Sequence, residues 1–277
     1  MAHSFDPGYC ASAFAQLVSD YPDEQVYPFK EFRTEWGPIF HRGRLDGSAR
    51  VLILGQDPAQ HETIARRILV GEAGQRIQGF LAKLGIDRSY VMINTYLYSV
   101  YGQGGGTKHK NDPAIAAYRN RWLDAIFAAS GIEAVVDLGQ LADNAFQLWK
   151  ATPKGLATHV VAVHITHPTQ PESSAGNDAV KHAAAIKAML QNWNAALPIV
   201  KAAIQHPDRA VALALYGDKF VPGDELEIPE QDMPAGLPAW MRGAKNWATR
   251  TGATAALKRV TITVTIPTGS RPARRGL

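Results

Sequence analysis

One stretch of the chain decides its fold: Arg50-Val51-Leu52-Ile53-Leu54-Gly55-Gln56-Asp57-Pro58. Residues 50–55 form a short apolar run, rich in aliphatic side chains, that ends at a glycine, and this pattern predicts a buried strand. Three further runs of the same kind follow along the chain, at 90–94, 134–139 and 159–164. They are apolar throughout rather than alternating, which is typical of strands covered on both faces.

Helical patterns separate these strands. Apolar residues recur at helical spacing in five segments, which are about 10–19, 61–85, 113–130, 140–149 and 177–192. Gly71 and Gly74 interrupt the second segment, and Pro113 is well placed in the first turn of the third. Strands that alternate with helices indicate parallel βαβ units. The sequence therefore predicts an α/β fold, a three-layer αβα arrangement around a central, mostly parallel four-stranded sheet, plus a C-terminal extension.

The composition changes after residue 193. Pro, Gly and acidic residues become frequent through 217–240, and residues 260–266 alternate like a half-buried edge strand. We therefore divide the chain into a main domain, residues 1–193, and a C-terminal extension, residues 194–277, which packs on the main domain and has no assigned function.

Composition and charge limit the classes of protein to which this chain can belong. Its 277 residues include 46% apolar side chains, enough for a sizeable core, and carry a formal net charge of +4. So small a positive charge permits a nucleic-acid partner without requiring one. The single cysteine, Cys10, excludes an internal disulfide, a four-cysteine zinc site and a cysteine-held iron–sulfur cluster.

The sequence shows no sign of a membrane segment or of an export signal. The first residues lack a basic region followed by an apolar run, and no apolar stretch reaches the length of about 18 residues that a membrane span needs. We therefore expect no membrane partner and a cytoplasmic location.

Polar side chains follow three of the predicted strands. Residues 55–60 follow the first strand, Asn94 ends the second, and residues 166–170 follow the fourth. In an open parallel sheet, ligands bind beyond the carboxyl ends of the strands. We therefore expect Asp57, Asn94 and His167 to face one crevice.

These three residue types together suit the cleavage of an N-glycosidic bond. The amide of Asn94 offers a donor and an acceptor, which match the edge of a uracil base. His167 can donate to an oxygen that becomes negative as the base leaves, and Asp57 can orient a water or stabilise a sugar cation. Each residue alone has a plain structural alternative, as a strand-end hydrogen bonder, a loop histidine or a turn residue, but the combination favours catalysis.

With these residues in view, the chain resembles the uracil-DNA glycosylase superfamily over about residues 50–192. Gly55-Gln56-Asp57-Pro58 resembles the first motif of the family-1 enzymes, and His167-Pro168-Thr169 is similar to their second motif. The segment 69–75, Leu-Val-Gly-Glu-Ala-Gly-Gln, is similar to a stretch of the family-4 enzymes. The resemblance implies an atypical member, with a family-1-like aspartate, family-4-like spacing and no iron–sulfur cluster.

The resemblance also implies a reaction and a role for each site residue. A monofunctional enzyme of this kind flips deoxyuridine out of single- or double-stranded DNA and hydrolyses the base–sugar bond without a metal or cofactor, releasing free uracil. Asp57 is then catalytic because it positions the water and offsets the positive charge of the sugar, and His167 is catalytic because it stabilises the uracil anion. The implied substrate-binding residues are Gln56, Asn94, Leu69 and Ala59. We expect the enzyme to act as a monomer.

Some positions depart from the family patterns. Ala59 stands where family-1 enzymes have a tyrosine that blocks the methyl group of thymine, so either another side chain excludes thymine or the pocket accepts more bases. Leu69 stands where a phenylalanine of the family-4 enzymes stacks on the base, and leucine keeps the apolar contact but loses the aromatic geometry. The leucine that fills the gap left by the flipped base has no clear counterpart, and Pro171 occupies the nearest position.

Basic and polar side chains near these motifs are candidates for contacts with DNA phosphates. They are Lys108, Lys110, Thr169 and Gln170. For the two lysines, an equally good interpretation is that they belong to a solvated cluster of charges and contact no DNA. The arginines of the segment 271–275 could add non-specific attraction to nucleic acid, although a loose basic tail is the simpler interpretation.

Two other functions stay open. The space left by Ala59 suggests a glycosylase for another deaminated base, xanthine or hypoxanthine. The other is a catalytically silent nucleic-acid-binding module that keeps the fold, although the presence of Asp57 argues against it.

Overall fold

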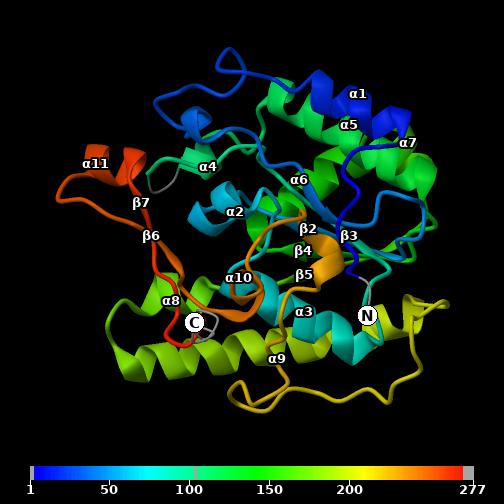
Figure 1. Ribbon diagram of the computed structural model, residues 1–277. Helices are drawn as coiled ribbons and strands as arrows, with labels where there is room; N and C mark the ends of the chain where they lie inside the picture. The colour runs from blue at the N-terminus through cyan, green and yellow to red at the C-terminus, as the bar shows by residue number, and fades with distance from the viewer. Residues whose placement is uncertain (1–2, 103–104, 271–277) are drawn as a thin grey trace, which may run out of the picture.

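The central sheet of the computed structural model, which describes residues 3–102 and 105–270, has five strands in the order β1-β3-β2-β4-β5 (Figure 1). The strands are β1 (His41–Gly43), β2 (Val51–Gly55), β3 (Tyr90–Asn94), β4 (Ala134–Leu138) and β5 (Val161–Ile165). The four predicted strands pair in parallel. The α/β class and the mostly parallel sheet are therefore confirmed.

The sequence analysis missed β1, which runs antiparallel to β3 at the edge of the sheet. This strand is three residues long and contains His41 and Arg42 instead of an apolar run, so hydrophobic periodicity gives no signal for it. The sheet consequently has one strand more than predicted.

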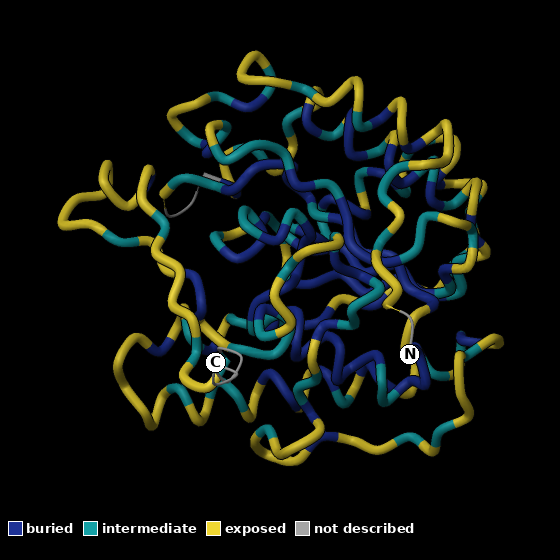
Figure 2. The backbone as a smooth tube through the Cα atoms, viewed as in Figure 1, coloured by how far each residue is buried: buried dark blue, intermediate teal, exposed yellow. Residues whose placement is uncertain are grey.

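Helices cover both faces of the sheet and complete three layers (Figure 1). Two of them, α3 and α9, cover one face, whereas α1, α5 and α6 cover the other. Their bounds are α1 (Ser12–Ser19), α3 (Glu72–Leu84), α5 (Pro113–Ala129), α6 (Gln140–Lys150) and α9 (Ala179–Ala203). From β2, Val51 and Ile53 pack in the core on the α3 side, and Leu52 and Leu54 pack in the core on the α5 side. All four side chains are 0% exposed, and Figure 2 shows the strands as the buried centre of the molecule.

Local sequence accounts for the start of α5 and for the break in the predicted segment 61–85. Asp112 accepts hydrogen bonds from the backbone N–H groups of Ala114 (2.9 Å) and Ile115 (3.2 Å), which caps α5 immediately before Pro113. The predicted segment 61–85 divides into α2 (Gln60–Ala65) and α3, and Gly71 is the N-cap of α3. Gly74 lies inside α3, so the interruption predicted at Gly74 is wrong.

Helix α9 extends beyond its predicted end near residue 192 and finishes at Ala203. Its buried face continues through Trp193, Leu197 and Val200, which join the core, so the end at 192 is wrong. The boundary expected at residue 193 therefore lies inside a helix, and the division of the chain there stays a prediction. Among the described residues, no helix combines the length and the apolar character that a membrane crossing requires.

The C-terminal part of the chain ends in a second, smaller sheet. Strand β6 (Ala248–Arg250) pairs antiparallel with β7 (Ile262–Val264), and α11 (Ala255–Val260) lies between them in the sequence. We call residues 248–264 the C-terminal hairpin. The alternating segment 260–266 thus contains β7, whose partner is β6. The remaining short elements are η1 (Thr34–Trp36), α4 (Gly105–Lys108), α7 (Pro153–Ala157), α8 (Gln170–Ala175), η2 (Glu230–Asp232) and α10 (Trp240–Gly243).

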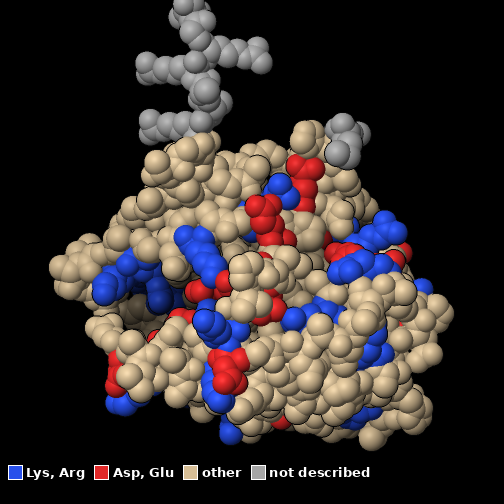
Figure 3. Space-filling model, turned by 90° about the horizontal axis from the view of Figure 1, so that it is seen from below, with Lys and Arg blue, Asp and Glu red and all other residues tan. Residues whose placement is uncertain are grey.

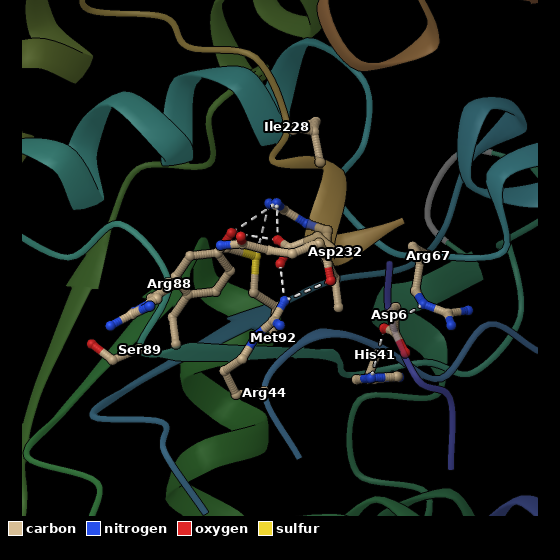
Figure 4. A network of polar contacts seen from close by, with 12 residues as sticks. Asp6, His41, Arg44, Arg67, Arg88, Ser89, Met92, Ile228 and Asp232 are labelled. Atoms are coloured by element: carbon tan, nitrogen blue, oxygen red, sulfur yellow. Dashed lines mark hydrogen bonds and ion pairs between the residues drawn. The ribbon is translucent and has the colours of Figure 1, made fainter. Parts of the chain in front are cut away.

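A buried ion pair ties the C-terminal extension to the edge of the central sheet (Figure 4). Nη1 of Arg42, on β1, lies 3.0 Å from Oδ2 of Asp232, on η2, and both side chains are 0% exposed. Arg44 also pairs with Asp232, and the hydroxyl of Tyr90 donates to it. Burial, together with the charge of Asp232, raises the pKa of Tyr90 well above its usual value, so the phenol stays a donor. The extension therefore supplies the carboxylate that these two guanidinium groups share.

We expect Asp232→Asn to lower the free energy of unfolding by about 3–5 kcal/mol, because it leaves buried guanidinium charge without a counter-charge. Urea unfolding of the full chain measures the loss. Asp87→Asn is the matched control, since Asp87 pairs with Arg209 at 2.8 Å on the surface and such pairs contribute about 0–1 kcal/mol. Equal losses in the two variants would contradict this role for Asp232.

Candidate active site

A cavity of about 840 Å³, which we call the large cavity, opens at the carboxyl ends of β2, β4 and β5. Its walls come from the loops that follow these strands and from α9. Several residues that the sequence singled out line it together, namely Gln56, Asp57, Ala59, His167, Thr169 and Gln170. His164, which the sequence placed on a strand, also lines the cavity from β5.

The carboxylate of Asp57 is held at both oxygens. Oδ2 accepts a hydrogen bond from the backbone N–H of Val100 (2.9 Å), and Oδ1 accepts one from Nε2 of Gln56 (3.0 Å). Burial raises the pKa of Asp57 to about 6, although these two hydrogen bonds and the charge of Arg33 oppose the rise. A carboxylate with this pKa is ionised at neutral pH and is still a useful proton acceptor.

His167 is neutral and has a defined tautomer. Its Nδ1 accepts a hydrogen bond from the backbone N–H of Thr169 (3.3 Å), so the ring proton lies on Nε2. Burial lowers the pKa of His167 to about 4, which keeps the ring uncharged at neutral pH. Gly139, with φ +84°, packs closely against His167. A Cβ added to Gly139 would lie only 3.3 Å from the Cβ of His167. The tight packing at Gly139 and the bond to Thr169 both orient the imidazole.

Asn94 lies at the end of β3, next to the last residue of β2. Its register partner is Gly55, and a Cβ on Gly55 would collide with Oδ1 of Asn94. Glycine is therefore required at 55 if the amide is to lie there. Asn94 is not among the side chains that line the large cavity, and within the described residues its amide makes no hydrogen bond. Its role in base recognition stays a prediction.

Leu69 packs in the main core instead of lining the large cavity. Its side chain is 7% exposed and belongs to the hydrophobic cluster on the α3 side of the sheet. Its backbone has φ +52°, a left-handed conformation that is costly for leucine. The carbonyl of Leu69 faces Gly74 so closely that any Cβ there would collide with it. The structure thus explains Gly74, and contact between Leu69 and a base stays a prediction.

Glu62 is a site residue that the sequence analysis missed. Its Oε2 accepts a hydrogen bond from the backbone N–H of Ala59 (3.0 Å), and its Oε1 accepts one from the N–H of Val70 (3.1 Å). The side chain, 7% exposed, therefore joins the loop after β2 to the loop before α3. A Glu three residues after a helix N-cap is a known capping pattern, and this signal could have identified it.

The two lysine candidates for DNA contact lie away from the large cavity. Lys108 pairs with Glu31, and Lys110 is exposed. Neither lines the large cavity, and the segment 271–275 lies outside the described residues. His61, which adjoins the first motif, uses Nε2 to accept a hydrogen bond from the N–H of Ala248 (3.3 Å), so it holds the C-terminal hairpin.

A scan against protein-family models matches residues 42–193 to the uracil DNA glycosylase superfamily, more than half of the chain. The chain belongs to the uracil-DNA glycosylase superfamily. This finding confirms the resemblance drawn from the two motifs and supports a glycosylase that acts on DNA. A comparison with curated protein sequences finds no match. Within the described residues, no three His, Cys, Asp or Glu side chains come together in a group that could hold a metal ion.

We expect Glu62→Gln to lower the free energy of unfolding by about 1–3 kcal/mol, because an amide cannot accept from both N–H groups and one stays unsatisfied. Urea unfolding measures this loss. Glu24→Gln is the control: Glu24 accepts from the Thr34 hydroxyl at an exposed site (2.9 Å), so its loss is expected within about 0.5 kcal/mol. A loss for Glu62→Gln no larger than that of the control would show that the buried clamp is unimportant.

Proposed function

We propose that this protein is a monofunctional DNA glycosylase that removes uracil from DNA and leaves an abasic site for base excision repair. One observation carries the proposal: an ionisable carboxylate, Asp57, and a neutral histidine, His167, line a single cavity in a member of this superfamily. The substrate is uracil-containing DNA, single- or double-stranded, and the product is free uracil. The enzyme acts as a monomer.

The reaction begins when the target nucleotide leaves the base stack and its base enters the large cavity, at an unstacking cost of about a few kcal/mol. The bond between C1′ and N1 then breaks, and its electron pair stays on the uracil. Nε2–H of His167 donates to the oxygen of the leaving base where negative charge accumulates. Asp57 faces the sugar, offsets its positive charge and accepts the proton of the water that attacks C1′.

The protonation states of the two groups support these roles. With a pKa of about 6, Asp57 is about nine-tenths ionised at pH 7. With a pKa of about 4, His167 donates from a neutral ring, so the anionic base does not take its proton during departure. In a purely structural carboxylate, the surroundings normally stabilise the charged form and so lower the pKa. A raised pKa in a cavity is instead typical of a functional residue. This argues against a catalytically silent module.

A glycosylase for xanthine or hypoxanthine is the second candidate. Ala59 is exposed and lines the large cavity, where a tyrosine would narrow the space beside a pyrimidine. A wider pocket favours larger, purine-derived bases. Oligonucleotides that carry uracil, xanthine or hypoxanthine, treated with enzyme and then hot alkali, distinguish the two candidates by which base yields strand cleavage.

We expect cleavage at uracil by the wild type, and slower excision by the site variants. Asp57→Asn removes the proton acceptor and lowers the rate by about 10²–10⁴-fold. His167→Ala removes the donor to the leaving base and lowers it by about 10²–10³-fold. His159→Ala, on an exposed residue, is the matched control and retains the wild-type rate. No strand cleavage at uracil by the wild type, on either form of DNA, would refute the proposal.

The pH dependence of kcat/KM tests the protonation state of Asp57. Because the pKa of Asp57 is raised to about 6 and the carboxylate is the active form, kcat/KM falls about tenfold per pH unit below pH 6. His167, with a pKa of about 4, becomes protonated only at lower pH and does not cause the fall near pH 6. Asp57→Asn lacks the fall near pH 6. A wild-type fall near pH 4, the ordinary aspartate range, would contradict the assignment.

A further inference from the structure

A second cavity, of about 680 Å³, lies beside the loop that contains Asp57, and the C-terminal hairpin forms part of its wall. Arg33, Arg250 and Lys258 line it, together with Gln60 and Tyr101. We call it the cationic cavity. In Figure 3, Lys and Arg side chains gather around a hollow on the left of the molecule, the side on which Figure 1 places α8, α11, β6 and β7.

Among the residues that the structure describes, the three cations of this cavity pair with no carboxylate. Within the described residues, Arg33, Arg250 and Lys258 form no ion pair, whereas the neighbouring Arg259 pairs with Glu35. Arg33 is 4% exposed, and its Nε has no hydrogen-bond partner among the described residues. Burial, together with the charges of Arg250 and Arg259, lowers the pKa of Arg33 to about 10, although the charges of Asp57 and Glu35 oppose this fall. Buried positive charge without a paired carboxylate is unfavourable, and three cations around one cavity repel one another, so this arrangement favours an anionic ligand.

The cationic cavity adjoins the site of Asp57. The backbone of Val100 joins the two, because its N–H donates to Asp57 and its carbonyl accepts from Nη1 of Arg33. Gln60 lines the cationic cavity and Ala59 lines the large cavity, so the two cavities flank a single loop. A polymer with its reacting unit in one cavity has its adjoining units within reach of the other.

Contacts with the main domain hold the C-terminal hairpin in place. Trp247, which is 1% exposed, packs edge-to-face on His61, and the ring of His61 binds the backbone of Ala248. At the other side of the hairpin, Nε1 of Trp36 donates to the carbonyl of Arg259 (2.8 Å). The cations of the hairpin therefore project from an anchored element, and the cationic cavity is built into the fold.

We propose that the cationic cavity binds a backbone phosphate of the DNA strand whose base enters the large cavity, so that the C-terminal hairpin is part of the DNA-binding surface. This inference rests on the proposed function for the identity of the ligand. All three cations lie outside residues 42–193, the segment that matches the superfamily. The phosphate site is thus an addition that this chain makes to the shared glycosylase core.

The salt dependence of DNA binding tests the proposal. The affinity of the full chain for a uracil-free oligonucleotide is measured against salt concentration for the wild type, Arg250→Ala, Lys258→Ala and the double variant. Each lost phosphate contact reduces the slope of log K against log salt by about 0.9 on duplex and about 0.7 on single-stranded DNA. Arg250 and Lys258 are exposed, so the variants retain the fold, which urea unfolding checks.

Lys219→Ala is the matched control, because Lys219 is an exposed lysine of the C-terminal extension outside the cationic cavity, and its loss changes the net charge by the same amount. A lowered slope for Arg250→Ala and Lys258→Ala, with the wild-type slope for Lys219→Ala, supports the proposal. Equal slopes in all the variants overturn it, and uracil excision by the wild type would then still stand. Conversely, a lowered slope without excision by the wild type removes the proposed function and keeps the phosphate contact.

Inorganic phosphate is the second probe, since a free anion has the same chemistry as a backbone phosphate. If inorganic phosphate raises the melting temperature of the wild type and not of Arg250→Ala, while the DNA slopes are equal, the cavity is a site for a small anion and the proposal fails. If Arg250→Ala lowers the DNA slope, backbone phosphate is the ligand.

Discussion

The buried pair between Arg42 and Asp232 is the interaction on which the rest of the structure depends. It joins the edge strand β1 to the C-terminal extension, and Arg42 also donates to the backbone of the loop between α2 and α3. Glu62 binds that same loop and holds Ala59, two residues after Asp57. The buried pair is therefore connected, through the loop between α2 and α3 and through Glu62, to the loop that contains Asp57. An unpaired guanidinium in this core would be strongly unfavourable.

Burial determines the protonation state of both catalytic candidates, and in each case it disfavours the charged form. It raises the pKa of Asp57 and lowers the pKa of His167. The site therefore combines a carboxylate whose charged form is only weakly stabilised with a neutral histidine that can donate a hydrogen bond. The charge of Arg33 limits the rise at Asp57. Arg33 thus contributes to both cavities: its charge stabilises the carboxylate of Asp57 beside one, and its side chain lines the other.

The parts of the fold that the sequence predicted well are those with a strong local signal. Strands β2 to β5 appear where apolar runs end at polar loops, and α5 starts at its Asp–Pro cap. Strand β1 was missed because its pairing with β3, and not an apolar run of its own, decides its structure. The last turns of α9 were missed although their apolar residues continue at helical spacing. Asp57 and His167 line one cavity, whereas Leu69 packs in the core and does not line that cavity.

The sequence by itself determined the strand order along the chain, the polar motifs after the strands and the superfamily, because these depend on residues that are neighbours in the chain. The tertiary structure alone decided the protonation states, the Glu62 clamp and the cationic cavity. The cations at 33, 250 and 258 are far apart in the sequence and meet only when the C-terminal hairpin packs on the main body. Desolvation and Coulomb energies depend on distance in space, and no local pattern encodes that distance.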